Sequence, residues 1–125
     1  MYFPKGNLNP AVSVGLLAGG KLSLLKCVLY IFAQCIGAIL GATVLYLATP
    51  VAARAALGSN TVSSGVPVFG AFVMELLLTS LLIMVIYASA VDSNNKSAPM
   101  LPPLLIGLTV TVAHLVLMPY TGVPK

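Results

Sequence analysis

Few residues in this chain could do chemistry. The 125 residues include one histidine, His114, and two acidic residues, Glu75 and Asp92. A Ser-His-Asp arrangement would have to bring Asp92 and His114 together, but they lie near opposite ends of one apolar run. The sequence has neither the ligand spacing of a metal site nor a glycine-rich phosphate loop. It therefore predicts no enzyme, no metal site and no cofactor.

Asn9 is the polar residue with the most informative surroundings. It precedes Pro10 at the start of a short apolar segment, residues 9–18, which ends at Gly19 and Gly20. Asparagine is a favoured N-cap, proline suits the first helical position and glycine commonly ends a helix. About nine helical residues give roughly 13 Å, under half of the ~30 Å hydrocarbon layer of a membrane. The segment is therefore predicted to be a re-entrant half-helix, buried in protein or beside a water-filled path.

Three longer apolar runs must position these residues. They cover residues 24–48, 67–91 and 100–118, and crossing a bilayer takes about 20 residues. The chain is 59% apolar and 6% charged, whereas a soluble domain carries about 25% charged residues. A soluble domain and a disordered chain are thereby excluded, and only two cysteines exclude a disulfide scaffold. The sequence predicts an all-α integral membrane protein with several spans.

The basic residues suggest an orientation and exclude nucleic-acid binding. The six lysines and arginines are scattered along the chain, whereas a nucleic-acid surface needs a concentrated basic face. Placing Lys21, Lys26 and Lys96 in the cytoplasm leaves Arg54 in the external loop, which satisfies the positive-inside rule.

The first span, residues 24–48, contains small and sulfur-bearing residues. Cys27 and Cys35 are eight positions apart, about 12 Å on a helix, which is too far for a disulfide, so both are predicted to be buried thiols. Gly37 and Gly41 form a Gly-x-x-x-Gly step, and small residues of this kind let membrane helices approach closely.

The stretch Gly6-Asn7-Leu8-Asn9-Pro10-Ala11-Val12-Ser13, with the re-entrant layout, resembles the first signature of the aquaporin (major intrinsic protein) family. That signature has a His-x-Asn-Pro-Ala-Val-Thr core. Four later stretches resemble the same family in order: residues 33–38, 72–75, 106–115 and 119–122. A bare Asn-Pro-Ala is a weak match, but five motifs in the right order are specific.

The resemblance implies an aquaporin-like right-handed helical bundle that is incomplete, with one re-entrant half-helix and three spans. Residues 1–125 would form a partial channel domain. By analogy, the chain begins inside the loop before the first half-helix and stops one residue before the second Asn-Pro-Ala motif. This predicts a fragment, which alone should give no water permeability.

The resemblance assigns Asn9 a role beyond capping. Its amide would donate to a passing solute at the positive end of the half-helix, which repels cations. Pro10 and Ala11 would be structural, fixing the helix start and packing against the second motif. Backbone carbonyls would line the cytoplasmic half at three positions: Gly6, Asn7 and Leu8.

The resemblance also names a filter and two braces. His114 matches the filter histidine of water-selective members, although a lone histidine in a span is otherwise often a satisfied core residue. Val123 matches the loop position of the filter, where a cysteine often accounts for mercurial block. Glu75 would brace the second pore loop, and Gln34 looks like a second buried brace.

Four positions depart from the family pattern. Asn7 stands for the usual histidine, Lys5 for a small residue and Ser13 for threonine. Lys125, before the expected second motif, is unusual for the family, so the resemblance does not extend to the conformation of that loop.

The leading functional expectation is passive water conduction by a homotetramer in the plasma membrane, with water and the lipid bilayer as partners. A facilitator of glycerol or a similar neutral solute is the alternative within the family, and His114 and the short external loop of residues 49–66 argue against it. A mainly structural membrane protein would need an adhesive external surface, whereas this loop is short and bland.

Overall fold

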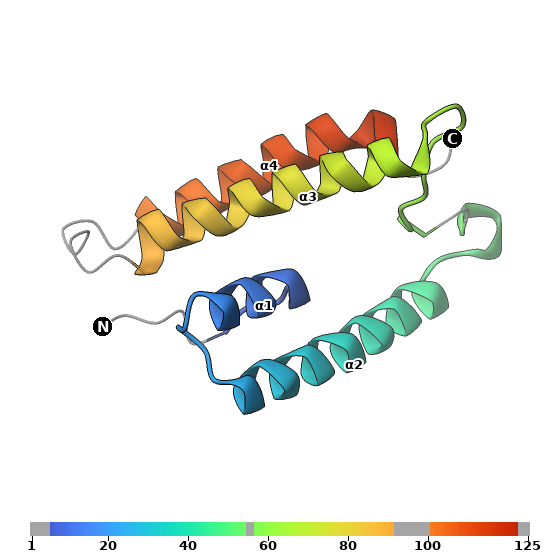
Figure 1. Ribbon diagram of the computed structural model, residues 1–125. Coiled ribbons are helices and arrows are strands. Elements are labelled where there is room, and N and C mark those ends of the chain that lie inside the picture. The colour runs from blue at the N-terminus through green and yellow to red at the C-terminus, as the bar shows by residue number, and fades with distance from the viewer. Residues whose placement is uncertain (1–5, 55–56, 92–100, 123–125) are drawn as a thin grey trace. The chain divides into compact units, whose positions relative to one another are not determined.

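The computed structural model describes residues 6–54, 57–91 and 101–122. Its helices are, in chain order, α1 (Pro10–Ala18), α2 (Leu24–Ala48), a 3-10 turn (Val51–Ala53), α3 (Val68–Ile86), a π-helical turn (Tyr87–Val91) and α4 (Leu101–Thr121) (Figure 1). The described residues contain no strand. The all-helical prediction is therefore confirmed.

The chain divides into two compact units. Helices α1 and α2 belong to the unit Lys5–Leu57, and helices α3 and α4 belong to the unit that includes Gly58–Lys125. Within the first unit α1 packs against α2, and within the second α3 packs against α4. Each unit therefore contains one helix pair and can be described by itself.

Helix α1 packs through one narrow face. Val12, Ser13 and Leu16 are buried, as is Cys27 near the start of α2. Residues one, three and four positions apart share a helix face, so this spacing presents a single face of α1. The prediction of a buried thiol is confirmed for Cys27 but wrong for Cys35, which is exposed. Eight residues turn a helix by about 80° beyond two full turns, which carries Cys35 off the packed face.

Helices α3 and α4 run antiparallel. Thr121 at the end of α4 contacts Glu75, which lies seven residues after the start of α3. Ala71 and Ile86 are the buried apolar residues of α3. Beyond Ile86 the helix widens into the π-helical turn, in which Ser89 is buried and its hydroxyl donates to the carbonyl of Val85 at 2.6 Å.

Three threonine hydroxyls on the long helices are satisfied within their own helix. Thr43, Thr109 and Thr111 each donate to the carbonyl four residues earlier, at 2.8 to 2.9 Å. This local bond is the usual partner of a helical hydroxyl. Because hydrocarbon offers no partner for a polar group, it makes these residues compatible with a membrane.

The end of α4 differs from the sequence prediction, which placed it at Met118. The helix continues to Thr121 and contains Pro119. Proline has no backbone N–H and so costs one helical hydrogen bond. The last turn is nevertheless held from outside, because the carbonyl of Tyr120 accepts from the backbone N–H of Ser63 at 2.9 Å.

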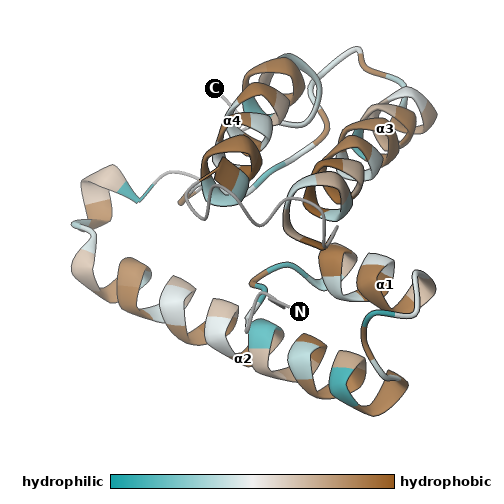
Figure 2. Cartoon of the chain, turned by 90° about the vertical axis from the view of Figure 1, so that its left-hand side faces the viewer, coloured by the Kyte–Doolittle hydropathy of each residue, from teal (hydrophilic) through white to brown (hydrophobic). Residues whose placement is uncertain are grey.

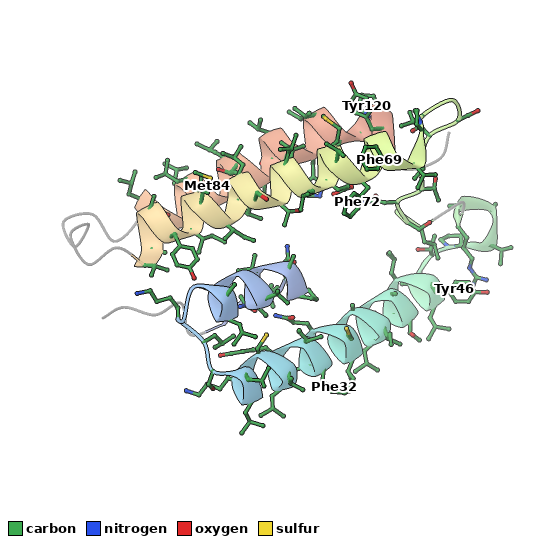
Figure 3. All side chains as sticks on the ribbon, in the orientation of Figure 1. Phe32, Tyr46, Phe69, Phe72, Met84 and Tyr120 are labelled. Carbon is green, nitrogen blue, oxygen red and sulfur yellow. The ribbon has the colours of Figure 1, made fainter. Side chains whose placement is uncertain are left out.

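The long helices are made mostly of apolar residues (Figure 2), and many of their large apolar side chains are exposed. Three helices are long and apolar enough to cross a membrane: Leu24–Ala48, Val68–Val91 and Leu101–Thr121. Large side chains such as Phe32, Phe69 and Phe72 project outward from them (Figure 3). The chain is an integral, multi-pass membrane protein, and these surfaces suit lipid or other apolar helices. No described residue would contact a Cβ added at Gly37 or Gly41, so close packing there stays a prediction.

Candidate functional site

The start of α1 is capped as its sequence predicts. Asn9 is the N-cap residue and Pro10 follows at the first helical position. The side-chain oxygen Oδ1 of Asn9 accepts from the backbone N–H of Ala11 at 2.9 Å. Since only the oxygen can accept, this bond fixes the orientation of the amide. The exposed Asn9 therefore has its Nδ2 group left to donate elsewhere.

Asn7, two residues before the cap, is the centre of three side chains, which we call the amide cluster (Asn7, Ser13 and Gln34). The hydroxyl of Ser13 donates to Oδ1 of Asn7 at 2.9 Å. Nε2 of Gln34 donates to the carbonyl of Asn7 at 2.8 Å and also to Oδ1 of Asn7. A third contact joins Nε2 of Gln34 to the hydroxyl oxygen of Ser13 at 3.1 Å. The cluster thus joins the loop before α1, the first turns of α1 and the middle of α2.

The three carbonyls expected to line a path are not equivalent. The Asn7 carbonyl already accepts from Gln34, whereas Gly6 and Leu8 lie on either side in exposed backbone. The side chain of Leu8 is 96% exposed. A carbonyl that holds a strong donor is a weaker acceptor for a further partner, so Gly6 and Leu8 have the freer carbonyls of the three.

His114 lies on the exposed side of α4, two turns before its end. Its Nδ1 is 2.8 Å from the carbonyl oxygen of Val110. A carbonyl oxygen only accepts, so Nδ1 must carry the proton. In a neutral imidazole Nε2 is then an acceptor, and it is directed away from the helix backbone. The ring can therefore accept a hydrogen bond from a hydroxyl or from water.

Glu75 has a single described side-chain partner at the end of α4. The hydroxyl of Thr121 donates to Oε1 of Glu75 at 2.6 Å, and Thr121 is 8% exposed. We call this pair the carboxylate contact (Glu75 and Thr121). A hydrogen bond to a charged acceptor is shorter and stronger than a neutral one, so the pair joins α3 to α4 at a polar point in an apolar surface.

The loop before α3 also binds the end of α4. The backbone N–H of Thr61 donates to the carbonyl of Gly122 at 3.3 Å, beside the bond from Ser63 to Tyr120. These bonds satisfy carbonyls that a helix end leaves without partners. A Cβ added at Gly122 would lie 2.2 Å from the backbone oxygen of Met118. Glycine is therefore required where the chain leaves α4.

The sequence identified most of these side chains but not how they pair. Asn9, Gln34, Glu75 and His114 were singled out, whereas the parts played by Ser13 and Thr121 were not. A signal was present for Ser13, because it replaces threonine in the same motif in which Asn7 replaces histidine. Val123, expected to complete the filter, lies outside the described residues. Among the described residues no group of three or more histidine, cysteine or acidic side chains could hold a metal ion.

Comparison with known proteins gives one family. The profile of the major intrinsic proteins matches residues 5–124. Aquaporin-5 from Rattus norvegicus and from Homo sapiens are each 43% identical over 117 residues, which cover 94% of this chain and 44% of each relative. Aquaporin-4 from Mus musculus is 40% identical over 117 residues, which cover 94% of this chain and 36% of the relative. The chain thus spans less than half of the length of these relatives.

Proposed function

The chain belongs to the major intrinsic protein family, and on that premise we propose that it is part of a passive transmembrane channel for water. The observation that carries the proposal is the geometry at Asn9. With Oδ1 committed to the helix start, the Nδ2 group is a donor at the N-terminus of a half-length helix. A helix N-terminus carries roughly half a positive charge. A donor beside that charge favours the oxygen of a neutral solute and disfavours cations.

The mechanism needs acceptors as well as a donor. In our proposal the carbonyls before the half-helix, at Gly6, Asn7 and Leu8, accept from water that approaches the amide of Asn9. Pro10 and Ala11 fix the start of the helix. Water crosses by exchanging hydrogen bonds along this path and down its osmotic gradient, without a catalytic group or a cofactor.

The filter is proposed at His114 and Val123. With its proton on Nδ1, His114 offers Nε2 as an acceptor for water and a ring that narrows the path. The similar proteins are named aquaporins, that is, water channels, which supports water as the solute. Val123 gives this position no thiol, so we expect weak block by mercurials through this route. Gln34 and Glu75 are proposed as braces of the backbone around the path.

We also propose how the protein assembles and in which membrane it lies. The exposed apolar surfaces of α2, α3 and α4 are compatible with a homotetramer in a bilayer, with one path in each subunit, and the plasma membrane is the proposed location. A glycerol facilitator remains the second candidate function, and a mainly structural membrane protein the third.

The experiment compares two solutes and one substitution. The protein that carries this chain is reconstituted in lipid vesicles, and water and glycerol permeabilities are measured by light scattering. The wild type should conduct water and little glycerol. His114→Gly should raise glycerol permeability about tenfold, because it removes a bulky side chain, an effect equivalent to about 1.4 kcal/mol of barrier. Equal glycerol flux in both proteins would contradict the filter, and no water or glycerol flux in either would favour the structural role.

A further inference from the structure

The amide cluster contains one residue on which two helices converge. Oδ1 of Asn7 accepts from Ser13 on α1 and from Gln34 on α2. Ser13 has no exposed surface, and its hydroxyl has two acceptors within reach: Oδ1 of Asn7 at 2.9 Å and the carbonyl of Asn9 at 3.4 Å. Without Asn7 this buried hydroxyl keeps only the longer and weaker bond to Asn9, so the loss of the shorter bond destabilises the fold. The position of Asn7 is therefore constrained from two directions by groups that need it.

The same residue is also held through its backbone. Nε2 of Gln34 contacts both the side-chain oxygen and the carbonyl oxygen of Asn7. Two contacts from one amide to one residue fix the side chain and the peptide plane together. The direction of the Asn7 carbonyl follows from this, and so does the path of the backbone from Gly6 to the N-cap at Asn9.

We propose that Asn7 is the positioning residue of the half-helix: its side-chain oxygen, held by Ser13 and Gln34, sets the backbone before Asn9. It turns its own carbonyl toward Gln34, so those of Gly6 and Leu8 are the freer acceptors along the path. This inference rests on the proposed function, because it assigns the acceptors of that path. Asn7 acts through the backbone, so its side chain does not touch the solute.

The chemistry of the cluster restricts what can replace Asn7. Ser13 and Gln34 both present donors, so residue 7 must supply an acceptor oxygen at the end of a short side chain. Aspartate has that oxygen and the same shape. Leucine has a similar shape and no acceptor. The pair Asn7→Asp and Asn7→Leu therefore separates the hydrogen bonds from the packing.

The first measurement is backbone hydrogen exchange in the protein that carries this chain, solubilised in detergent. Asn7→Leu and Ser13→Ala should each raise the exchange rates of the amides of Ala11 to Leu16 about tenfold, since one buried hydrogen bond is worth about that ratio. Asn7→Asp, which keeps the acceptor oxygen, should raise these rates less than threefold. The double variant Asn7→Leu with Ser13→Ala should raise exchange by less than the product of the two single effects, because both substitutions remove the shared bond between Ser13 and Asn7. Ser80→Ala, an exposed serine on α3, is the control and should leave these amides unchanged.

The second measurement is water permeability per folded channel in vesicles. Asn7→Leu should lower it about three- to tenfold at equal amounts of folded protein, a change expected from misdirecting one acceptor. Wild-type exchange in Asn7→Leu and in Ser13→Ala would overturn the inference. The inference would also be overturned if the wild type conducts water and Asn7→Leu exchanges faster but has the same water permeability as the wild type. If the wild type conducts no water, the proposed function fails, while the exchange result still decides whether Asn7 holds the half-helix.

Discussion

The amide cluster and the carboxylate contact both attach a segment at the end of one helix to a long helix, but with different chemical groups. In each, a side chain from a long helix binds a segment at the end of another helix: Gln34 binds the loop before α1, and Glu75 binds the last residue of α4. The first uses an uncharged amide and the second an acid. The difference follows from what each segment presents, since Asn7 presents oxygen acceptors and Thr121 presents a hydroxyl donor.

The two regions should therefore respond differently to the same exchange of amide and acid. If an amide that donates to acceptor oxygens is replaced by a carboxylate, oxygen atoms face one another without a donor between them. If a carboxylate that accepts from a hydroxyl is replaced by an amide, the amide oxygen can still accept. Charged hydrogen bonds are worth about 1.5–3 kcal/mol and neutral ones about 1 kcal/mol.

Exchanging amide and acid gives the largest expected effect. Gln34→Glu replaces both N–H donors with oxygen, which then faces the oxygens of Asn7. We expect a loss of about 3 kcal/mol in the free energy of unfolding, because breaking a buried polar pair leaves a charge uncompensated. Glu75→Gln keeps an acceptor for Thr121 and should cost about 1 kcal/mol. Denaturant unfolding in mixed micelles measures both, and equal losses would mean that the two regions do not differ.

Removing the donor of the carboxylate contact comes next. Thr121→Val keeps the shape of the side chain and deletes its hydroxyl, so it should cost about 2 kcal/mol, the typical value for a hydrogen bond to a charged group. Thr121→Ser keeps the hydroxyl and should cost less than about 1 kcal/mol, mainly for the lost methyl group. The same unfolding measurement decides, and a serine variant as unstable as the valine variant would assign Thr121 to packing alone.

Asn9 allows the cap to be separated from the path. Asn9→Ala removes the oxygen that binds the N–H of Ala11, so it should cost about 1 kcal/mol. Asn9→Ser restores a capping oxygen and should recover most of that stability, but it lacks the Nδ2 donor. We therefore expect Asn9→Ser to unfold like the wild type and yet conduct water more slowly in vesicles. A serine variant with wild-type permeability would show that capping is the only role of Asn9.

A partly exposed contact gives the smallest expected effect. The guanidinium of Arg54 lies 4.0 Å from the ring centroid of Tyr46 (labelled in Figure 3), and its Nε donates to the carbonyl of Thr49 at 3.1 Å. Cation–π contacts at accessible sites are worth about 0.5–1 kcal/mol, so Arg54→Ala should cost no more than this. Arg54→Gln, which keeps a donor without the charge, is the control in thermal unfolding. A loss as large as that of Thr121→Val would place Arg54 in a more critical contact than its position suggests.

The sequence predicted the helices well because their signals are local. Apolar runs, the cap at Asn9, Pro10 and the glycines after Ala18 mark where helices begin and end. Helix α4 continues beyond the predicted end of its apolar run at Met118, because bonds from a loop more than 50 residues earlier hold the final turn. The predicted burial of Cys35 was wrong, because hydrophobicity does not say which face of a uniformly apolar helix is covered by another helix.

In the candidate site, too, local signals identified single residues but not the pairs that they form. Residue types and motif positions identified Asn9, Gln34 and Glu75, but nothing local pairs Gln34 with Asn7, 27 residues earlier, or Glu75 with Thr121, 46 residues later. Such pairs depend on how two helices pack, and only the structure supplies them.

We propose that the protein carrying this chain conducts water and excludes ions. The most direct measurement is stopped-flow osmotic shrinkage of vesicles that contain it, with a pH-sensitive dye inside to record proton entry during the same run. Water permeability should rise well above that of empty vesicles, while proton entry stays at the level of the lipid alone. Water permeability equal to that of empty vesicles, or proton entry that rises together with it, would contradict the account.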